Sequence, residues 1–200
     1  ERLQNEFLRL QARLRKTIVF VTHDVDEAIK MADRIVILQV GGIVAQYDTP
    51  DRLLAAPASD FVERFVGADR GLKRLSLARV RDLTLEPVIT ATVGEPRSAV
   101  RARLTDNAGW VLVTDERRHP IGWVDAADLA GDGPVDAAMA VPGSSLLQPE
   151  STLRDALSTM LASSAQVGVV VDEREELLGV VSVAAISATM QDGAVPDGGS

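Results

Sequence analysis

The first third of the chain alternates short apolar runs with amphipathic segments. Residues 18–21 form a β-branched and aromatic run, which predicts a buried strand. Asp24, with Glu27 three residues later, can form a capping box, so a helix is expected to begin there. His23 is then predicted at the carboxyl end of that strand, where open α/β sheets bind ligands. From position alone, the favoured interpretation is a turn histidine that hydrogen-bonds to nearby backbone.

Turn and capping residues divide the following segment into short elements. Ser59 and Gly67 are expected to begin and end one helix. Phe61, Phe65 and Val66 on that helix are expected to face the core. The predicted elements are a hairpin of Ile35–Leu38 and Ile43–Tyr47 around Gly41-Gly42, helices over Pro50–Ala55 and Asp60–Val66, and a basic polar linker over residues 68–79.

From Val80 onward the pattern repeats itself at an offset of 57 residues. Trp110–Asp115 aligns with Val167–Asp172, and Ile121–Val124 aligns with Leu178–Val181. Each copy predicts the order strand, helix, strand, polar turn, strand, helix. A three-stranded sheet with two helices cannot bury both faces alone, so we expect the copies to complete one core. The predicted copies are residues 80–132 and 133–190, followed by a disordered tail over 191–200.

Composition narrows the possible functions. The chain is 46% hydrophobic, 25% charged and only 4% aromatic, which is typical of a globular protein with an aliphatic core. The net charge of −8 disfavours non-specific binding to nucleic acid or to an anionic membrane. The sequence has no cysteine and two distant histidines, His23 and His119, so we expect no metal site. No apolar run is long enough to cross a bilayer, so no direct membrane insertion is expected.

Seven basic residues gather in two stretches, for which we favour solvated faces over a ligand-binding patch. They are Lys73, Arg74, Arg79 and Arg81, and then Arg97, Arg101 and Arg103. His119 is expected to serve only in the polar turn before Ile121.

The first 75 residues resemble a known family in several separate stretches. The matching stretches are Lys16–Asp33, Ala32–Leu38, Gly41-Gly42, Gln46–Pro50, Ala58–Val62 and Gly67–Leu75. They are similar to the switch-histidine region of ABC-transporter ATPases, and most similar to the ATPase subunits of importers for glycine betaine, proline and choline. The resemblance implies that His23 reaches the γ-phosphate of ATP, as a neutral imidazole that can donate and accept a hydrogen bond.

Several motifs of that family are missing from the chain. It contains no Gly-x-x-x-x-Gly-Lys-[Ser/Thr] phosphate loop, no Leu-Ser-Gly-Gly signature and no strand that ends in Asp-Glu. Its first apolar residues, Leu3, Phe7, Leu10 and Leu14, have nearly helical spacing, as in the middle of a helix. The expectation is therefore a C-terminal part of a longer subunit, which would not hydrolyse ATP by itself.

The two repeats resemble CBS motifs, and two in tandem resemble a CBS pair. CBS motifs that bind adenosine nucleotides carry Gly-h-h-[Thr/Ser]-x-x-Asp, where h is apolar, and its hydroxyl meets the phosphate while its Asp meets the ribose. In the first copy Asp128 keeps the ribose-type carboxylate, but Asp125 replaces the hydroxyl with a charge that repels phosphate. In the second copy Ser182 keeps the hydroxyl, but Ala185 replaces the carboxylate.

Three interpretations of these residues stay open. We favour the one in which Asp125 and Ser182 only cap the final helices, over AMP or ATP binding in the two clefts. In osmoprotectant transporters of this type, the CBS regions of two subunits can also hold cyclic di-AMP between them. Trp110 and Trp123 are candidates for stacking on adenine, although core packing is the expectation we favour for both.

The sequence thus predicts an α/β chain, in which residues 1–67 are the C-terminal fragment of an ABC ATPase domain and residues 80–190 are a tandem CBS pair. The resemblance implies a homodimeric, cytoplasmic subunit that docks on the transporter's membrane subunit and uses ATP. The CBS pair would sense a nucleotide or ionic strength. The alternative is a stand-alone CBS dimerisation or scaffold module with neither ligand nor catalysis.

Overall fold

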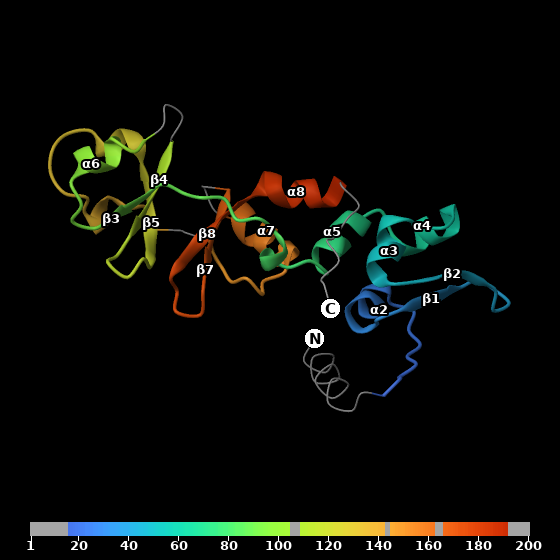
Figure 1. Cartoon of the computed structure of the whole chain (residues 1–200). Helices are drawn as coiled ribbons and strands as arrows, with labels where there is room; N and C mark the ends of the chain where they lie inside the picture. Colours follow the sequence, from blue (N-terminus) through green and yellow to red (C-terminus); the bar gives the residue numbers. More distant parts are fainter. Residues whose placement is uncertain (1–15, 105–108, 143–144, 163–165, 192–200) are drawn as a thin grey trace. The chain divides into compact units, whose positions relative to one another are not determined.

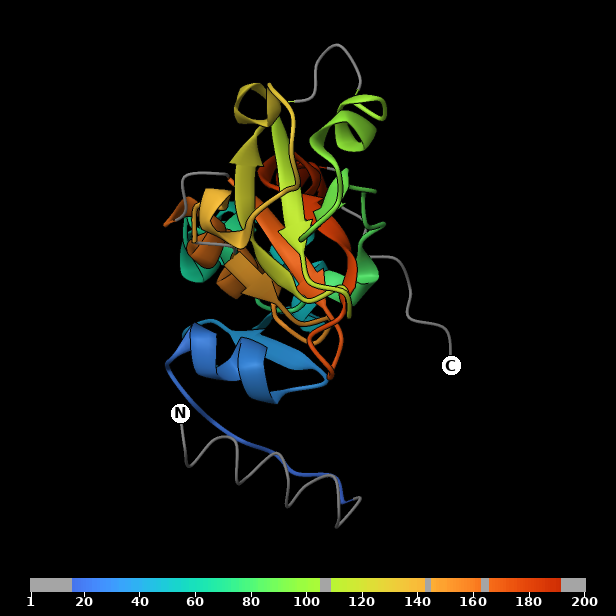
Figure 2. The same cartoon turned by 90° about the vertical axis from the view of Figure 1, so that its left-hand side faces the viewer.

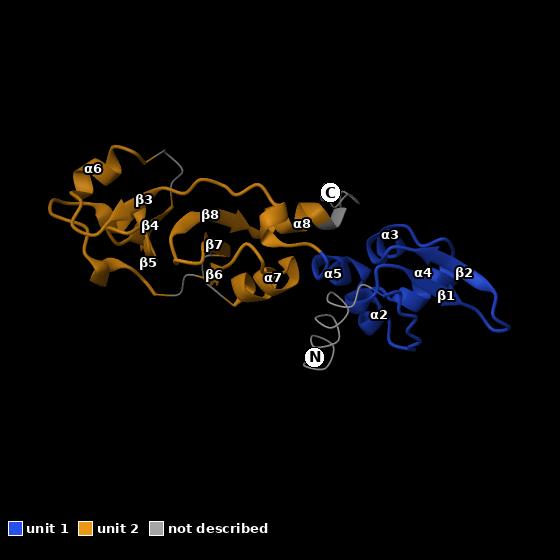
Figure 3. Ribbon diagram, turned by 60° about the horizontal axis from the view of Figure 1, so that its bottom comes forward, with its two compact units in different colours: residues 1–77 blue, residues 78–200 orange. Residues whose placement is uncertain are grey.

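The computed structural model describes residues 16–104, 109–142, 145–162 and 166–191. These residues divide into two compact units, with the boundary between residues 77 and 78 (Figure 3). The helical spacing predicted over Leu3–Leu14, and the predicted tail beyond Gln191, lie outside the described residues.

Unit 1 consists of short helices around one hairpin, as the turn and capping residues predict. Gly41 and Gly42 form the hairpin turn with φ values of 86° and 77°, which favour glycine. The core beneath the hairpin is aliphatic, and its buried members are Ile29, Ile37, Leu53, Leu54, Val62 and Val66. The elements are α2 (Val25–Met31), β1 (Ile35–Leu38), β2 (Val44–Asp48), α3 (Pro50–Ala55), α4 (Asp60–Val66) and α5 (Arg70–Leu75), and β1 and β2 are antiparallel.

The start of α2 confirms Asp24 as the capping residue. Its Oδ1 accepts hydrogen bonds from the amides of Asp26 at 2.8 Å and Glu27 at 3.2 Å. The amide of Asp24 donates to Thr22 Oγ1, and that hydroxyl donates to the carboxylate of Glu27. Thr22 thereby links Asp24 to Glu27, the two residues predicted to form a capping box.

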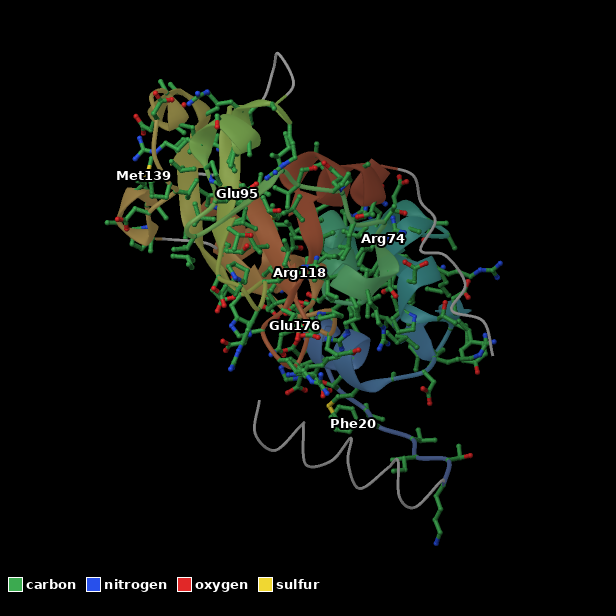
Figure 4. The ribbon with its side chains drawn as sticks, turned by 60° about the vertical axis from the view of Figure 1, so that its left-hand side comes forward. Phe20, Arg74, Glu95, Arg118, Met139 and Glu176 are labelled. Atoms are coloured by element: carbon green, nitrogen blue, oxygen red, sulfur yellow. The ribbon has the colours of Figure 1, made fainter. Side chains whose placement is uncertain are left out.

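Within the described residues, segment 18–21 does not form the predicted buried strand. The segment is extended but pairs with no strand among the described residues, and Val19 and Val21 are 88% and 90% exposed. Phe20, labelled in Figure 4, lies on this segment and is 53% exposed. A single strand leaves its backbone groups and both its faces without partners, so an apolar run alone does not bury itself.

Two further details of unit 1 differ from the sequence-based expectation. Phe65 is 44% exposed, because Val62 and Val66 form the buried face of α4, and it stacks on Phe61 with ring centroids 6.1 Å apart. The segment 68–79, expected as a linker, contains helix α5, on which Arg74 and Leu75 are buried.

Unit 2 contains two three-stranded sheets of the same topology. In each sheet the first strand is parallel to the second, and the second is antiparallel to the third. The first copy has β3 (Thr90–Thr92), α6 (Arg97–Arg101), β4 (Trp110–Thr114), β5 (Pro120–Asp125) and the 3-10 turn η2 (Ala126–Leu129). The second has β6 (Ser145–Leu147), α7 (Leu153–Leu161), β7 (Val167–Val171), β8 (Leu177–Ser182) and α8 (Val183–Gln191), and two further 3-10 turns are η1 (Val80–Asp82) and η3 (Ala137–Met139).

The structure confirms the repeat in detail. Strands β4 and β5 have the same lengths as β7 and β8, and their bounds differ by 57 residues. Each hairpin also has a register shift at the equivalent position, between Val113 and Thr114 and between Val170 and Val171. The final helix predicted for the first copy is wrong, because only the short 3-10 turn η2 forms there.

The two copies complete one core, as expected. Leu112 and Trp123 of the first copy pack against apolar residues of the second, namely Val169, Val171, Leu177 and Val180. The sheets that carry these side chains lie next to each other in both views of the chain (Figures 1 and 2). The core between the copies is thus formed by residues that neither copy could bury alone.

A segment that leads into each copy crosses to the third strand of the other copy. Glu86, before β3, makes an isolated antiparallel bridge to Val180 on β8, and Val141 makes the equivalent bridge to Trp123 on β5. A Cβ atom at Gly122 would lie 2.5 Å from the carbonyl oxygen of Val141, so only glycine allows this approach.

Candidate functional site

His23 lies in the loop directly before α2, with an exposed side chain. Its imidazole makes no hydrogen bond to any residue that the structure describes. The backbone-bonded turn histidine favoured from position alone is therefore not what this loop contains. The exposed ring can bond to a group beyond the described part of unit 1.

The junction between β5 and η2 contains both carboxylates predicted for the first copy. Asp125 Oδ1 accepts a hydrogen bond from the amide of Ala127 at 2.8 Å, so Asp125 caps η2 as the favoured interpretation predicts. Asp128 lies within η2 and is exposed. The amide of Ala126 bonds to the carbonyl of Gly109, which holds this junction against the start of β4.

The equivalent junction of the second copy, between β8 and α8, contains Ser182. Its hydroxyl oxygen accepts a hydrogen bond from the amide of Ala185 at 3.2 Å, which confirms the capping interpretation. The same hydroxyl donates to Glu86 Oε1 at 2.9 Å. The structure thus places Ser182 beside a carboxylate from the segment before β3.

Sequence reasoning missed Glu86. It lies 96 residues from Ser182 in the chain and outside the stretches that align between the two copies. Only the crossing of its segment to β8 brings the two side chains together. The sequence does contain one sign of this crossing, namely a glycine at position 179. In the structure a Cβ there would lie 3.0 Å from the Cβ of Leu85, but the glycine alone does not indicate which residue approaches it.

The two tryptophans have different environments. Trp123 is 7% exposed in the core between the copies, which confirms packing as its role, and its indole nitrogen has no partner among the described residues. Trp110 is 49% exposed, so the core position expected for it is wrong. It begins β4 opposite Asp125, at one end of the first sheet.

Two residues of the basic stretches, Arg74 and Arg101, bond to other groups of the protein, which the expectation of solvated faces did not predict. Arg74 is buried and its Nε lies 3.0 Å from Asp51 Oδ1. Arg101 donates to the carbonyls of Leu129 and Gly131, beside the first junction. These guanidinium groups bond to protein acceptors rather than forming an open patch.

Two carboxylates in unit 2 have lowered pKa values. The hydrogen bond from Arg103 holds the pKa of Glu95, labelled in Figure 4, below its ordinary value. The amide and the ring of His119 both bond to Asp115 and lower its pKa, with the amide as the larger cause. His119 therefore serves in its turn, as expected, and Asp172 caps the equivalent turn of the second copy.

Within the described ranges, no group of three or more His, Cys, Asp or Glu side chains is arranged to hold a metal ion. No described helix is both long and apolar enough to cross a membrane.

Comparison with known proteins identifies several relatives of this chain. A family model described as the CBS domain matches residues 146–191, within the second copy. The osmoprotectant import ATP-binding protein OsmV of Salmonella typhimurium is 38% identical, in an alignment that covers 91% of this chain and 48% of that protein. The glycine betaine/carnitine/choline transport ATP-binding protein OpuCA of Bacillus subtilis is 37% identical, in an alignment that covers 95% of this chain and 51% of that protein.

The chain is homologous to osmoprotectant ABC-transporter ATP-binding proteins over about half of their length, and it contains a CBS domain. It spans about half the length of the curated relatives it matches. Among solved structures, CBSX2 in complex with AMP is 18% identical and covers 57% of this chain and 97% of that chain, with a TM-score of 0.46.

The resemblance predicted from the sequence is thus confirmed. The mixed α/β fold with a CBS-pair-like unit is confirmed too, by the matched family and by the repeated sheets. That residues 1–67 form part of an ABC ATPase domain stays a prediction, because the structural neighbours do not make such a fragment evident.

Proposed function

We propose that this chain is the C-terminal, CBS-containing regulatory portion of the ATP-hydrolysing subunit of an importer for quaternary amines. The observation that supports this most is the extent of the similarity to osmoprotectant transport ATP-binding proteins. It covers 91% to 95% of the chain, and so includes unit 1 as well as the CBS repeats. A CBS module of another kind of protein would share unit 2 alone.

In this proposal unit 1 completes an ATPase domain. His23 acts as the switch residue at the γ-phosphate of ATP, and the exposed segment 18–21 becomes a strand of the ATPase sheet. The exposed, unbonded imidazole and the exposed valines support this role, because both need partners that the described residues of unit 1 do not supply. ATP is then the cofactor of the complete subunit, which lies in the cytoplasm against the transporter's membrane subunit.

Unit 2 is then the regulatory part and brings two subunits together. A symmetric dinucleotide such as cyclic di-AMP suits a site between two identical subunits, because it can lie on their two-fold axis. AMP or ATP at Asp128 or Ser182, and a response to ionic strength, are the other forms of sensing that the CBS pair allows.

A second candidate function is a CBS dimerisation or scaffold module without ligand or catalysis. The observation in its favour is that a carboxylate stands at both nucleotide-type junctions, Asp125 in the first copy and Glu86 beside Ser182 in the second. Either carboxylate would repel a phosphate group.

Isothermal titration of the full chain with cyclic di-AMP, AMP and ATP, at low and high salt, separates these functions. Saturation by cyclic di-AMP at half a ligand per chain is the result we expect from a regulatory site between two subunits. A well-folded dimer that gives no heat with any of the three ligands, and whose association does not respond to salt, would contradict regulation and favour the scaffold.

A further inference from the structure

The N-terminus of α8 already has an anion next to it. Glu86 Oε1 accepts a hydrogen bond from Ser182 Oγ at 2.9 Å, and the amide of Ala185 donates to the same hydroxyl. The N-terminus of a helix carries a partial positive charge, so a carboxylate next to it is stabilised there. The hydroxyl at the position that meets a phosphate in the nucleotide-binding motif therefore already donates to a carboxylate of the same chain.

The backbone determines where Glu86 lies. Its amide donates to the carbonyl of Val180 at 2.8 Å, and its carbonyl accepts from the amide of Val180 at 3.0 Å. Val180 lies two residues before Ser182 on β8, so this pairing brings Glu86 to the end of that strand. Gly179 allows the close approach, because a side chain there would meet Leu85 and the carbonyl of Glu86.

The first copy has a carboxylate at the equivalent junction by a different route. Asp125 is the residue equivalent to Ser182, and its own side chain caps the following turn. In the first copy the acidic residue, Asp125, is part of the motif itself. In the second copy the acidic residue, Glu86, comes from the segment that crosses between the copies. The two routes give both junctions the same charge.

We propose that Glu86 is a specificity-determining residue that occupies the anion position of the second copy and excludes phosphorylated ligands from it. A nucleotide phosphate at Ser182 would have to displace the carboxylate and would then be repelled by it at short range. This deepens the proposed function and rests on it, because it assigns phosphorylated regulators to a site away from Ser182, on a surface shared by two subunits.

The test is titration of the full chain with AMP, comparing the wild type with Glu86→Gln. Glutamine keeps an acceptor for the Ser182 hydroxyl and removes the charge. We expect the AMP affinity of Glu86→Gln to rise by about tenfold or more over the wild type. Glu116→Gln, which removes a charge from an exposed turn, is the matched control and should bind AMP as the wild type does.

A double variant, Glu86→Gln with Ser182→Ala, tests the location of the gain. We expect it to lose the added affinity, since the hydroxyl that would bind the phosphate is gone. Thermal unfolding of each variant establishes that it is folded, because loss of a capping hydroxyl lowers helix stability.

Equal AMP affinity in the wild type and a folded Glu86→Gln would overturn the proposal. Wild-type binding of AMP that Glu86→Gln weakens would overturn it too, since Glu86 would then assist the nucleotide. Cyclic di-AMP titrated into the wild type tests the proposed function separately, because that binding does not depend on whether Glu86 excludes AMP.

Discussion

The two units of the chain differ in how completely they bury their apolar side chains. Unit 2 packs the inner faces of two equivalent sheets against each other, so that Leu112 and Val169 are fully buried. Unit 1 buries one side of its hairpin through Ile37 and leaves the other side open, with Val36 and Leu38 half-exposed. A duplicated unit supplies its own partner, whereas a single layer of helices and one hairpin needs a partner from elsewhere.

The largest expected difference between the units is in their resistance to proteolysis. We expect a protease to cut the chain in residues 16–23 and elsewhere in unit 1 before it cuts within residues 80–190. The reason is that segment 18–21 is extended and exposed, and cleavage needs an accessible backbone. Mass spectrometry of the early fragments locates the cuts, and equal resistance of the two units would count against the comparison.

Paired truncations of leucine sharpen the comparison. Leu112→Ala removes a fully buried side chain from the core between the copies and should lower the free energy of unfolding by about 2–5 kcal/mol. Leu38→Ala removes a side chain that is 52% exposed on the hairpin, and should cost well under about 1 kcal/mol. Urea denaturation measures both, and similar losses would show that unit 1 is packed as completely as unit 2.

The crossing segments give a smaller effect that is specific to unit 2. Gly122→Ala brings a Cβ within 2.5 Å of the carbonyl of Val141, so the bridge between the copies must shift, at about 1–3 kcal/mol. Gly109→Ala is the control, because nothing lies within 4 Å of the added atom. If thermal unfolding finds the two variants equally stable, the crossing is not held as closely as described.

The smallest expected effect is the pH dependence that Glu95 contributes. Its pKa is lowered by Arg103, so its stabilisation is present above the unfolded pKa and is lost as pH falls through the folded pKa. Because Arg103 is 48% exposed, Glu95→Gln should lower stability at neutral pH by less than about 1 kcal/mol. We expect this deficit in melting temperature to vanish once the pH lies below the folded pKa, and a deficit that grows on acidification would contradict the assignment.

Local signals in the sequence predicted most elements of both units, because they act within a few residues. Asp24, Ser59 and the glycines of the hairpin turn behave as predicted, and the repeat gave the second copy from the first. The errors arise where burial depends on a distant partner. Residues 18–21 lack the neighbouring strand that their composition requires, and Trp110 lies at a sheet end that the sequence does not mark.

The candidate site was predictable only in part. Asp125 and Ser182 have the capping roles that the motif comparison favours, since capping is local. Glu86 could not be found in this way, because its contact with Ser182 depends on which strand its segment joins. Functional contacts made by crossing segments need the topology as well as the motif.

Uptake by a chimeric transporter tests the central claim most directly, namely that unit 1 completes an ATPase. The chimera carries this chain in place of the matching half of the Bacillus subtilis OpuCA protein, and choline uptake is measured in cells under osmotic stress. We predict uptake by the chimera and its loss in His23→Ala, with ATP binding retained in both. A chimera that is produced and binds ATP but takes up no choline would contradict the account, as would full uptake with His23→Ala.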